Sequence, residues 1–313
     1  MENPLLELQE YENLQEALKK AKGPVQATGT LDSQKVHLMH WLGKDGGFPW
    51  KLVVTYDDQR AREIYDDFRS FTEGVWLYPA KDLLFYSADI HGNLMTRQRI
   101  AVWRHLMEEE EGVVVTTLDG LMDHLLPLVF LKQQAVTVEN GQVMDLDEWK
   151  ERLTALGYER TAQVDGMGQF SIRGGIVDIF PLTEEVPVRI ELWDDEVDSI
   201  RSFDPENQRS VEQLEKITIY PAAETILTKK QLEAGIERLE KEEKEYEAAL
   251  RAKHQIEEAS RIRGIIKELT EGITQGWKRD GLDAYIRYFC PEIVSFLDYF
   301  QAGDTLIRLD EQA

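Results

Sequence analysis

A regular succession of apolar runs and amphipathic segments is the feature of this sequence that most constrains its fold. Lys51–Tyr56 and Gly112–Thr117 are rich in β-branched residues, which is typical of strands covered on both faces. Asp57–Phe71 and Thr96–Met107 carry apolar residues at helical spacing, and Val75–Tyr78 between them is a short strand. Strands that alternate with helices in this way predict an α/β fold built on a parallel sheet.

Residues 169–210 follow a different pattern, that of consecutive short strands. In Val188–Trp193 the aliphatic residues occupy every second position, so that Arg189 and Trp193 share the other face of a half-buried strand. The same alternation turns Arg173 outward in the strand that begins near Gln169. An arginine and a large aromatic residue on an otherwise polar face are more typical of a binding surface than of packing.

Two glycine-containing steps predict turns in this part of the chain. Gly174-Gly175 predicts a bulge or a close approach of the backbone between two strands. Asn140-Gly141, between Val136–Val138 and Gln142–Met144, predicts a type I′ hairpin.

The change of pattern near Phe130 predicts a second domain, and the return of α/β character after it predicts that this domain is inserted into a split first one. We divide the chain into residues 1–132, the first half of an α/β domain, residues 133–222, a smaller inserted β-rich α+β domain, and residues 223–313, the second half. The last part begins with highly charged helices over Lys229–Gly276, in which Glu247 and Arg251 are spaced for an ion pair. Asp304–Leu309 is the final predicted strand, and we expect further domains beyond it.

Composition limits the classes of partner. The formal charge of −23 over 313 residues opposes binding of duplex DNA through phosphate neutralisation, so the expected partner is a protein. The lone cysteine, Cys290, excludes an internal disulfide and fits a reducing compartment. No stretch has the character of a membrane span or a signal peptide, so we expect a cytoplasmic protein that makes no contact with a membrane.

A strand-to-helix junction occupies the place of a phosphate-binding loop, after a predicted strand at Pro24–Gly29. A working loop needs glycines, a lysine for the phosphates and a hydroxyl for Mg²⁺. Here Leu31 replaces a glycine and Asp32 replaces the lysine, so that an ordinary turn capped by Asp32 is favoured over nucleotide binding. The degenerate, non-functional loop consists of Thr28, Gly29, Thr30, Leu31, Asp32 and Ser33.

Other candidate sites are weaker. Asp310-Glu311 has the form of the acidic pair that orders Mg²⁺ in ATPases, but without a phosphate loop the pair has no substrate. His37 and His40 lack further ligands in the sequence nearby, and the acidic run at residues 194–198 is explained more simply by a hairpin turn. We therefore predict no catalytic residue and no metal site.

The segment FSIRGGIVDIFPLTEEVPVRIELWDDEVDSIRSFDPENQRS, with GLDAYIRYFCPEIVSFLDYF and the terminal Asp310-Glu311, resembles the N-terminal region of the bacterial transcription-repair coupling factors (Mfd). The resemblance runs through essentially the whole chain. It implies a module homologous to the excision-repair protein UvrB, with a split, degenerate P-loop domain of the helicase-like type and a smaller domain between its halves. UvrB has a TGTGKT-like loop and a tyrosine-rich hairpin; this chain has TGTLDS, and residues 78–93 lack a comparable tyrosine cluster.

The resemblance also implies a partner and its contact residues. The small domain is similar to the surface that binds UvrA, the damage-recognition ATPase, and the UvrA-binding positions correspond to Arg173, Arg189 and Trp193, the last often Phe in the family. Full-length members also carry an RNA polymerase-binding region and an ATP-driven DNA translocase, which would both lie beyond Ala313. ATP and Mg are expected only there, and this segment is expected to need no cofactor.

The expected function is therefore that of a non-catalytic module that recruits UvrA to RNA polymerase stalled at DNA lesions. One alternative is an ATP-dependent DNA-remodelling enzyme in its own right. A second alternative is an autoinhibitory clamp whose Arg and Trp face packs inside the full-length protein. A third is that Trp193 is simply a core residue, because strands of α/β folds are often covered on both faces.

Overall fold

The computed structural model of the chain describes residues 3–81, 89–274 and 282–310. The chain forms two compact units, one of Met1–Asp123 with Ser295–Ala313 and the other of His124–Val294. The first unit thus consists of two segments that are far apart in the sequence. The three-part division at residues 132 and 222 remains a prediction.

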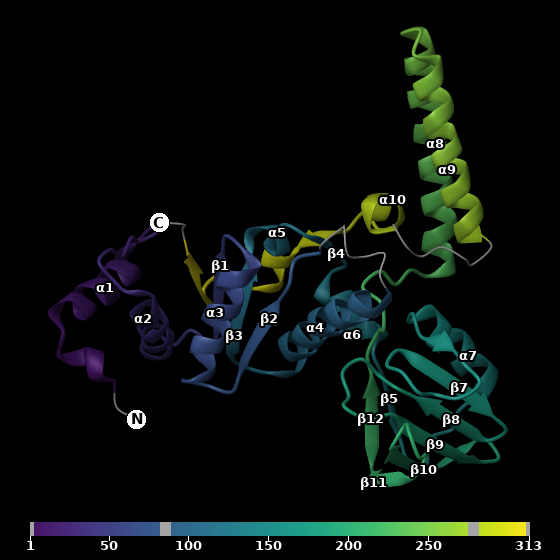
Figure 1. Cartoon of the computed structure of the whole chain (residues 1–313), viewed down its shortest axis with the longest axis horizontal. Coiled ribbons are helices and arrows are strands. Elements are labelled where there is room, and N and C mark those ends of the chain that lie inside the picture. Colours follow the sequence, from purple (N-terminus) through teal and green to yellow (C-terminus); the bar gives the residue numbers. More distant parts are fainter. Residues whose placement is uncertain (1–2, 82–88, 275–281, 311–313) are drawn as a thin grey trace. The chain divides into compact units, whose positions relative to one another are not determined.

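The first unit is built on a parallel sheet with the strand order β14-β1-β3-β2 (Figure 1). Its strands are β1 (Trp50–Thr55), β2 (Val75–Tyr78), β3 (Gly112–Thr117) and β14 (Thr305–Leu309). The parallel α/β character predicted from the sequence is confirmed. The final strand pairs with β1 along the whole of its length, which places the C-terminal segment beside a strand that precedes it by about 250 residues in the sequence.

Helices cover both faces of this sheet. Val53, Val113 and Val115 pack against helices α2 (Asp32–Asp45) and α3 (Asp58–Arg69) on one face. On the other face, α4 (Asp89–Glu108) places Arg99 over the Tyr78 ring, and the short helix α5 (Leu118–Leu121) lies close to β3. Helix α1 (Gln9–Lys20) and the 3-10 turns η1 (Pro4–Glu7) and η3 (Phe296–Tyr299) complete the described part of this unit.

The segment Pro24–Gly29 forms no strand, which corrects the sequence-based expectation. All of its side chains except that of Val25 are exposed, so pairing on the sheet would gain little apolar burial. Pro24 also has no N–H to donate to a ladder. The start of α2 differs as well: its N-cap is Leu31, whose N–H donates to the Gln34 side chain at 3.0 Å, and not Asp32.

The second unit contains a six-stranded sheet with the order β11-β10-β9-β8-β7-β6, antiparallel except for the β6–β7 pair. The strands are β6 (Glu159–Arg160), β7 (Gln169–Arg173), β8 (Ile176–Ile179), β9 (Val188–Trp193), β10 (Glu196–Phe203) and β11 (Ser210–Leu214). One face packs on helix α7 (Leu146–Ala155) through Trp149 and Leu153, with Phe170, Val177 and Ile190 from the sheet. A β-rich α+β arrangement is thus confirmed for this region.

Strand β5 (Val136–Glu139) pairs with β12 (Lys216–Ile219), so the predicted hairpin at Asn140-Gly141 is wrong. Val136 and Val138 face Ile219 and Ile217 in this pairing, which joins two apolar strands in the core. Residues 142–144 run instead beside the start of β10, where the Met144 N–H donates to the Asp195 carbonyl at 2.7 Å.

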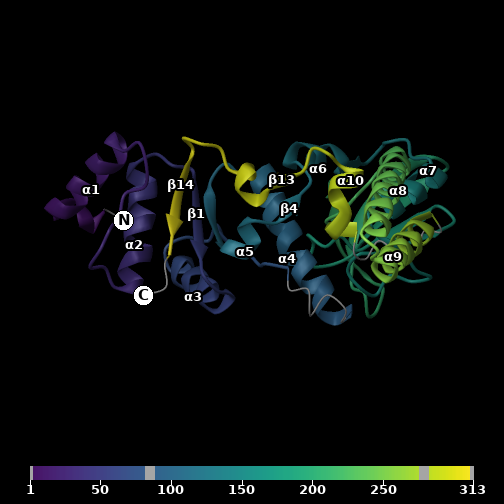
Figure 2. The same cartoon turned by 90° about the horizontal axis from the view of Figure 1, so that it is seen from above.

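The charged segment forms a helical hairpin of α8 (Lys229–Ala252) and α9 (Ile256–Thr274), which lie side by side in Figures 1 and 2. Thr228 caps α8 in a capping box with Gln231, and the predicted Glu247–Arg251 ion pair is present at 2.6 Å. The remaining described elements of the chain are α6 (Leu128–Gln134), η2 (Leu282–Tyr285), α10 (Ile286–Phe289), β4 (His124–Leu125) and β13 (Val294–Ser295). No helix among the described residues is both long and apolar enough to cross a membrane.

Candidate functional site

The alternation in β9 separates a core face from an open face. Val188 and Ile190 are buried in the core, whereas Trp193 at the end of the strand is 81% exposed. The interpretation of Trp193 as a core residue is therefore wrong. On the same face, the Arg173 side chain is 50% exposed and that of Arg189 is 18% exposed, so Arg189 is less open than its outward position predicts.

Asp178 of β8 joins the two arginines. The strand register sets Asp178 opposite Arg189, and Arg173 lies across the β7–β8 hairpin from Ile176. The Asp178 carboxylate accepts hydrogen bonds from Arg173 Nη2 at 2.7 Å and from Arg189 Nε and Nη2 at 2.6 and 2.9 Å. A single carboxylate, itself only 1% exposed, thus holds both guanidinium groups.

Arg189 has further contacts that account for its low exposure. Its Nη2 also donates to Gln208 Oε1 at 3.1 Å, and its guanidinium lies 4.6 Å from the centre of the Phe203 ring. Phe203 belongs to a small buried cluster with Val164 and Phe180. Arg189 therefore lies between this cluster and the open part of the face, fixed on several sides.

A second ion pair extends the face towards β10. Arg201 lies opposite Arg189 in the register and pairs with Glu191, whose carboxylate also accepts a hydrogen bond from Ser199 Oγ at 3.3 Å. Neither Asp178 nor Arg201 was predicted as a site residue from the sequence. Alternation in Ile176–Ile179 would have turned Asp178 outward, but only the strand register reveals that it lies opposite Arg189.

The turns around this face fit its sequence. Gly174 has φ +61°, and a Cβ on Gly175 would lie 3.0 Å from the Leu192 carbonyl oxygen, so the predicted close approach of the backbone is confirmed. Trp193 and Glu196 pair across a hairpin whose Asp194 has φ 60°, so the predicted turn is present at Asp194 and Asp195, whereas Glu196 and Asp198 lie in β10. Within the part of the chain that the structure describes, no group of three or more His, Cys, Asp or Glu side chains could hold a metal ion.

The residues of the predicted degenerate phosphate loop lie before and within the first turn of α2. Thr28, Gly29, Leu31, Asp32 and Ser33 are exposed, Thr30 is half-buried, and Gly29 has φ +80°. Asp32 forms ion pairs with Lys35 at 3.1 Å and with Arg60 at 3.0 Å. The hydrogen bond from Lys35 and the charge of Arg60 lower the pKa of Asp32.

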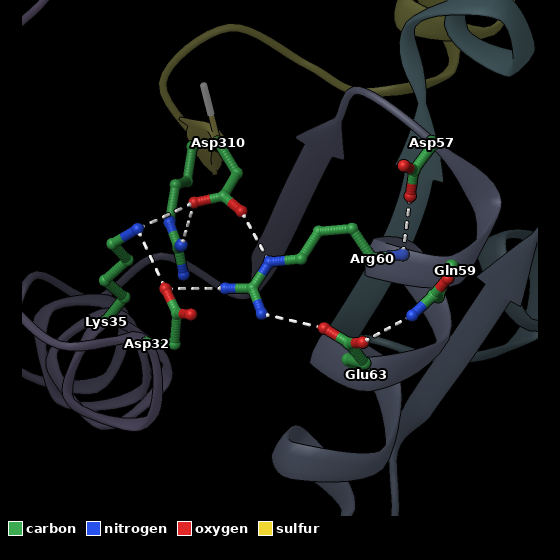
Figure 3. A network of polar contacts seen from close by, with 8 residues as sticks. Asp32, Lys35, Asp57, Gln59, Arg60, Glu63 and Asp310 are labelled. Atoms are coloured by element: carbon green, nitrogen blue, oxygen red, sulfur yellow. Dashed lines mark hydrogen bonds and ion pairs between the residues drawn. The ribbon is translucent and has the colours of Figure 1, made fainter. Parts of the chain in front are cut away.

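Asp310, directly after β14, belongs to the same network (Figure 3). Its carboxylate pairs with Arg60 Nε at 3.0 Å, with Arg308 Nη2 at 2.6 Å and with Lys35 Nζ at 3.4 Å. Arg60 also pairs with Glu63 at 3.1 Å. Glu311, the second member of the acidic pair, and most of residues 78–93, where the tyrosine cluster is missing, lie outside the described residues or side chains.

His37 and His40 both pack against Phe71. Each imidazole centroid is 5.4 Å from that of the Phe71 ring, and His37 Nε2 accepts a hydrogen bond from Trp41 Nε1 at 2.9 Å. Burial lowers the pKa of His40, with the charges of Lys51 and Lys44 acting in the same direction. The pair is thus part of an aromatic cluster.

The chain is similar in sequence to known proteins. Residues 136–224 match the family described as the UvrB interaction domain. The chain is 35% identical to the transcription-repair-coupling factor of Bacillus subtilis (strain 168) over 262 residues, which cover 83% of the chain and 22% of that relative. The corresponding protein of Staphylococcus haemolyticus is 31% identical over 266 residues, with the same coverage of each.

The chain thus spans about a fifth of the length of these relatives. The match to both relatives covers 83% of the chain, so it extends into both compact units, and the family match falls on the β-rich region that carries Arg173, Arg189 and Trp193. The chain therefore belongs to the transcription-repair-coupling factor family, matches its N-terminal region, and carries a UvrB interaction domain at residues 136–224.

Proposed function

We propose that the chain is a non-catalytic, UvrB-like module that recruits UvrA to RNA polymerase stalled at DNA lesions. The observation that carries the proposal is the open face of β7–β9, where Trp193 is 81% exposed on the same face as Arg173 and Arg189. Tryptophan and arginine dominate the residues that contribute most to protein–protein binding. The name of the matched family, UvrB interaction domain, supports a protein partner at this part of the chain.

The chemistry of the face indicates what it would bind. Arg173 donates to Asp178 through Nη2, and its side chain is half exposed. The rest of its guanidinium group is therefore available for a carboxylate of the partner. Trp193 offers a flat apolar surface and an indole N–H donor. The proposed partner surface therefore presents an acidic side chain near an apolar depression that accepts the indole ring.

We further propose that the first unit is a degenerate helicase-like domain that does not bind ATP. Asp32 sets a carboxylate where a phosphate loop would require a lysine, and this would repel the phosphates. Lys35 and Arg60, the cations nearest to Asp32, are paired with Asp32 and Asp310. Asp310 in turn is surrounded by three cationic side chains, an arrangement that supports a structural role for it in place of Mg²⁺ binding.

Titration with a fluorescent ATP analogue and Mg²⁺ tests this second proposal. We expect no saturable signal in the micromolar range, because the region offers acidic groups and paired cations to an anionic ligand. Saturable micromolar binding that unlabelled ATP competes away would support the alternative, an ATP-dependent DNA-remodelling enzyme in its own right.

The remaining length of the relatives is the proposed location of the other activities. RNA polymerase binding, DNA translocation and the need for ATP and Mg would belong there, and this segment would work without a cofactor. In that arrangement the segment supplies the contact to UvrA while the rest of the protein supplies the contact to the polymerase.

Capture of the chain by immobilised, purified UvrA tests the recruitment proposal. We expect the wild-type chain to be retained and Arg173→Glu to be lost, because the variant replaces an exposed cation by an anion facing an acidic partner. Arg173 is the better position for this reversal: a glutamate at position 189 would lie against the buried Asp178 and perturb the fold. Equal retention of wild type and Arg173→Glu, with unchanged circular dichroism, would contradict the proposal.

A further inference from the structure

A buried carboxylate on the open face of a sheet calls for an explanation. Asp178 alternates with Val177 and Ile179, which lie in the core, so it belongs to the face that also carries Trp193. It is nevertheless fully buried. Its neighbour across the β7–β8 ladder, Ser171, is also buried and donates to the Ala162 carbonyl at 3.1 Å. A buried charge is costly unless it is fully paired.

Asp178 contacts Arg173 and Arg189, which together with Trp193 form the proposed docking surface. Both of its oxygens accept hydrogen bonds, one from Arg189 and the other from Arg189 and Arg173. No other ion pair of these two arginines is recorded among the described residues. The carboxylate thus fixes the guanidinium groups relative to each other and to the strand.

The two arginines differ in what they leave available. Arg189 is bound to Asp178 and Gln208 and stacked on Phe203, and only 18% of its side chain is exposed. Arg173 makes one of these contacts and remains half exposed. Arg189 is therefore placed to support the surface without contacting a partner itself. Arg173 and Trp193 are exposed enough to contact a partner directly.

From this geometry we infer that Asp178 is a positioning residue of the docking surface: together with Arg189 it holds the Arg173 guanidinium in the orientation that the partner recognises. The inference rests on the proposed UvrA interaction and adds a division of roles to it. Asp178 and Arg189 act through Arg173. Fixing a long side chain before association reduces the entropy lost on binding, which is the physical gain of such an arrangement.

The negative charge of Asp178 and its proposed positioning role predict opposite changes in affinity when the charge is removed. A carboxylate beside a surface that binds acidic groups weakens binding by simple electrostatics, so its neutralisation in Asp178→Asn would strengthen binding if charge were its only effect. A positioning role predicts the opposite, that is, weaker binding in spite of the loss of one negative charge. The matched control is Glu212→Gln, an exposed acid-to-amide change on β11 of the same sheet.

The experiment is calorimetric titration of the chain with purified UvrA. We expect Asp178→Asn and Arg189→Lys each to weaken binding about tenfold, within the range that coupled neighbours show, and Glu212→Gln to leave it unchanged. Arg189→Lys keeps the charge but replaces the planar guanidinium by a single nitrogen, which does not reproduce the paired contacts of Nε and Nη2 with the two Asp178 oxygens. It preserves the test if Asp178→Asn does not fold. The double variant should have the same affinity as the single variant that binds less tightly. Both changes break the same contact, the one between Asp178 and Arg189.

The position of the Arg189 guanidinium can also be checked by NMR in the absence of UvrA. In the wild-type chain the Arg189 Nε–H should give a slowly exchanging, resolved NMR signal, which is lost in Asp178→Asn. Wild-type affinity in both single variants would overturn the positioning role while leaving the proposed function intact. If the wild-type chain itself fails to bind UvrA, the proposed function fails instead, and the two results are distinguished in the first titration.

Discussion

Trp193→Ala is expected to weaken binding of UvrA by roughly 30-fold or more, the loss that corresponds to about 2 kcal/mol for a residue at the centre of an interface. The physical reason is the exposure of the indole: a side chain of this size that is 81% exposed in the free chain has most of its apolar area still to bury. Calorimetric or surface-plasmon titration with UvrA measures the effect. Trp193→Phe should retain much of the affinity, since a ring of similar shape remains.

The control for this prediction is Tyr246→Ala, which removes another exposed aromatic side chain, on α8. Tyr246→Ala should bind UvrA as the wild type does. The thermal midpoint of Trp193→Ala should equal that of the wild type, because the indole makes little contact with the rest of the fold. Full affinity in Trp193→Ala would remove Trp193 from the proposed interface, and a lowered midpoint would show that the residue supports the domain.

Asp310→Ala is expected to lower the free energy of unfolding of the first unit by about 3 kcal/mol, the effect of removing one partner from a buried ion pair. Asp310 and Arg60 are 4% and 10% exposed, and their contact links the end of β14 to α3. Without the carboxylate, the Arg60 guanidinium would keep only the more exposed Asp32 and Glu63. Urea denaturation followed by circular dichroism measures the change.

Asp32→Ala is the matched control, because Asp32 belongs to the same network but is 63% exposed. Little change in stability is expected for it, as exposed ion pairs contribute little. If the two variants are equally stable, the network is not a structural support of the unit, and the interpretation of Asp310 as a structural residue is wrong.

The pH dependence of stability checks the same network. Burial alone would raise the pKa of Asp310, but the Arg60 hydrogen bond and the charges of Arg308 and Lys35 outweigh it and hold the pKa below its ordinary value. A carboxyl group with a lowered pKa in the folded state contributes stability that is present above its unfolded pKa of about 4 and is lost as the pH falls further. The wild type should therefore lose more stability than Asp310→Asn as the pH falls from 5 to 3, because only the wild type has this carboxylate to protonate.

Much of the fold could be predicted because its signals are local. The valine runs in β1 and β3 and the helical spacing in α3 are properties of single segments, and burial of these segments enforces them. The pairing of β5 with β12 joins residues about 80 positions apart, and no local pattern specifies it. The Asn140-Gly141 step indicates a turn, but the segment after a turn need not pair with the strand before it.

The candidate site divides in the same way. Alternation alone places Arg173, Arg189 and Trp193 on one face, because successive side chains of a strand point to opposite sides. It does not reveal how open each of them is. Arg189 is covered by Phe203 and Gln208, which reach it from β10 and from the turn that follows. The role of Asp178 depends on a cross-strand register that only the folded sheet shows.

Titration of purified UvrA into the wild-type chain and into Arg173→Glu decides whether the face that carries Arg173 and Trp193 binds UvrA. We expect saturable binding to the wild-type chain and its loss in Arg173→Glu, with the circular dichroism of the two chains identical. Absence of binding to the wild-type chain, or equal binding to both, would contradict this expectation.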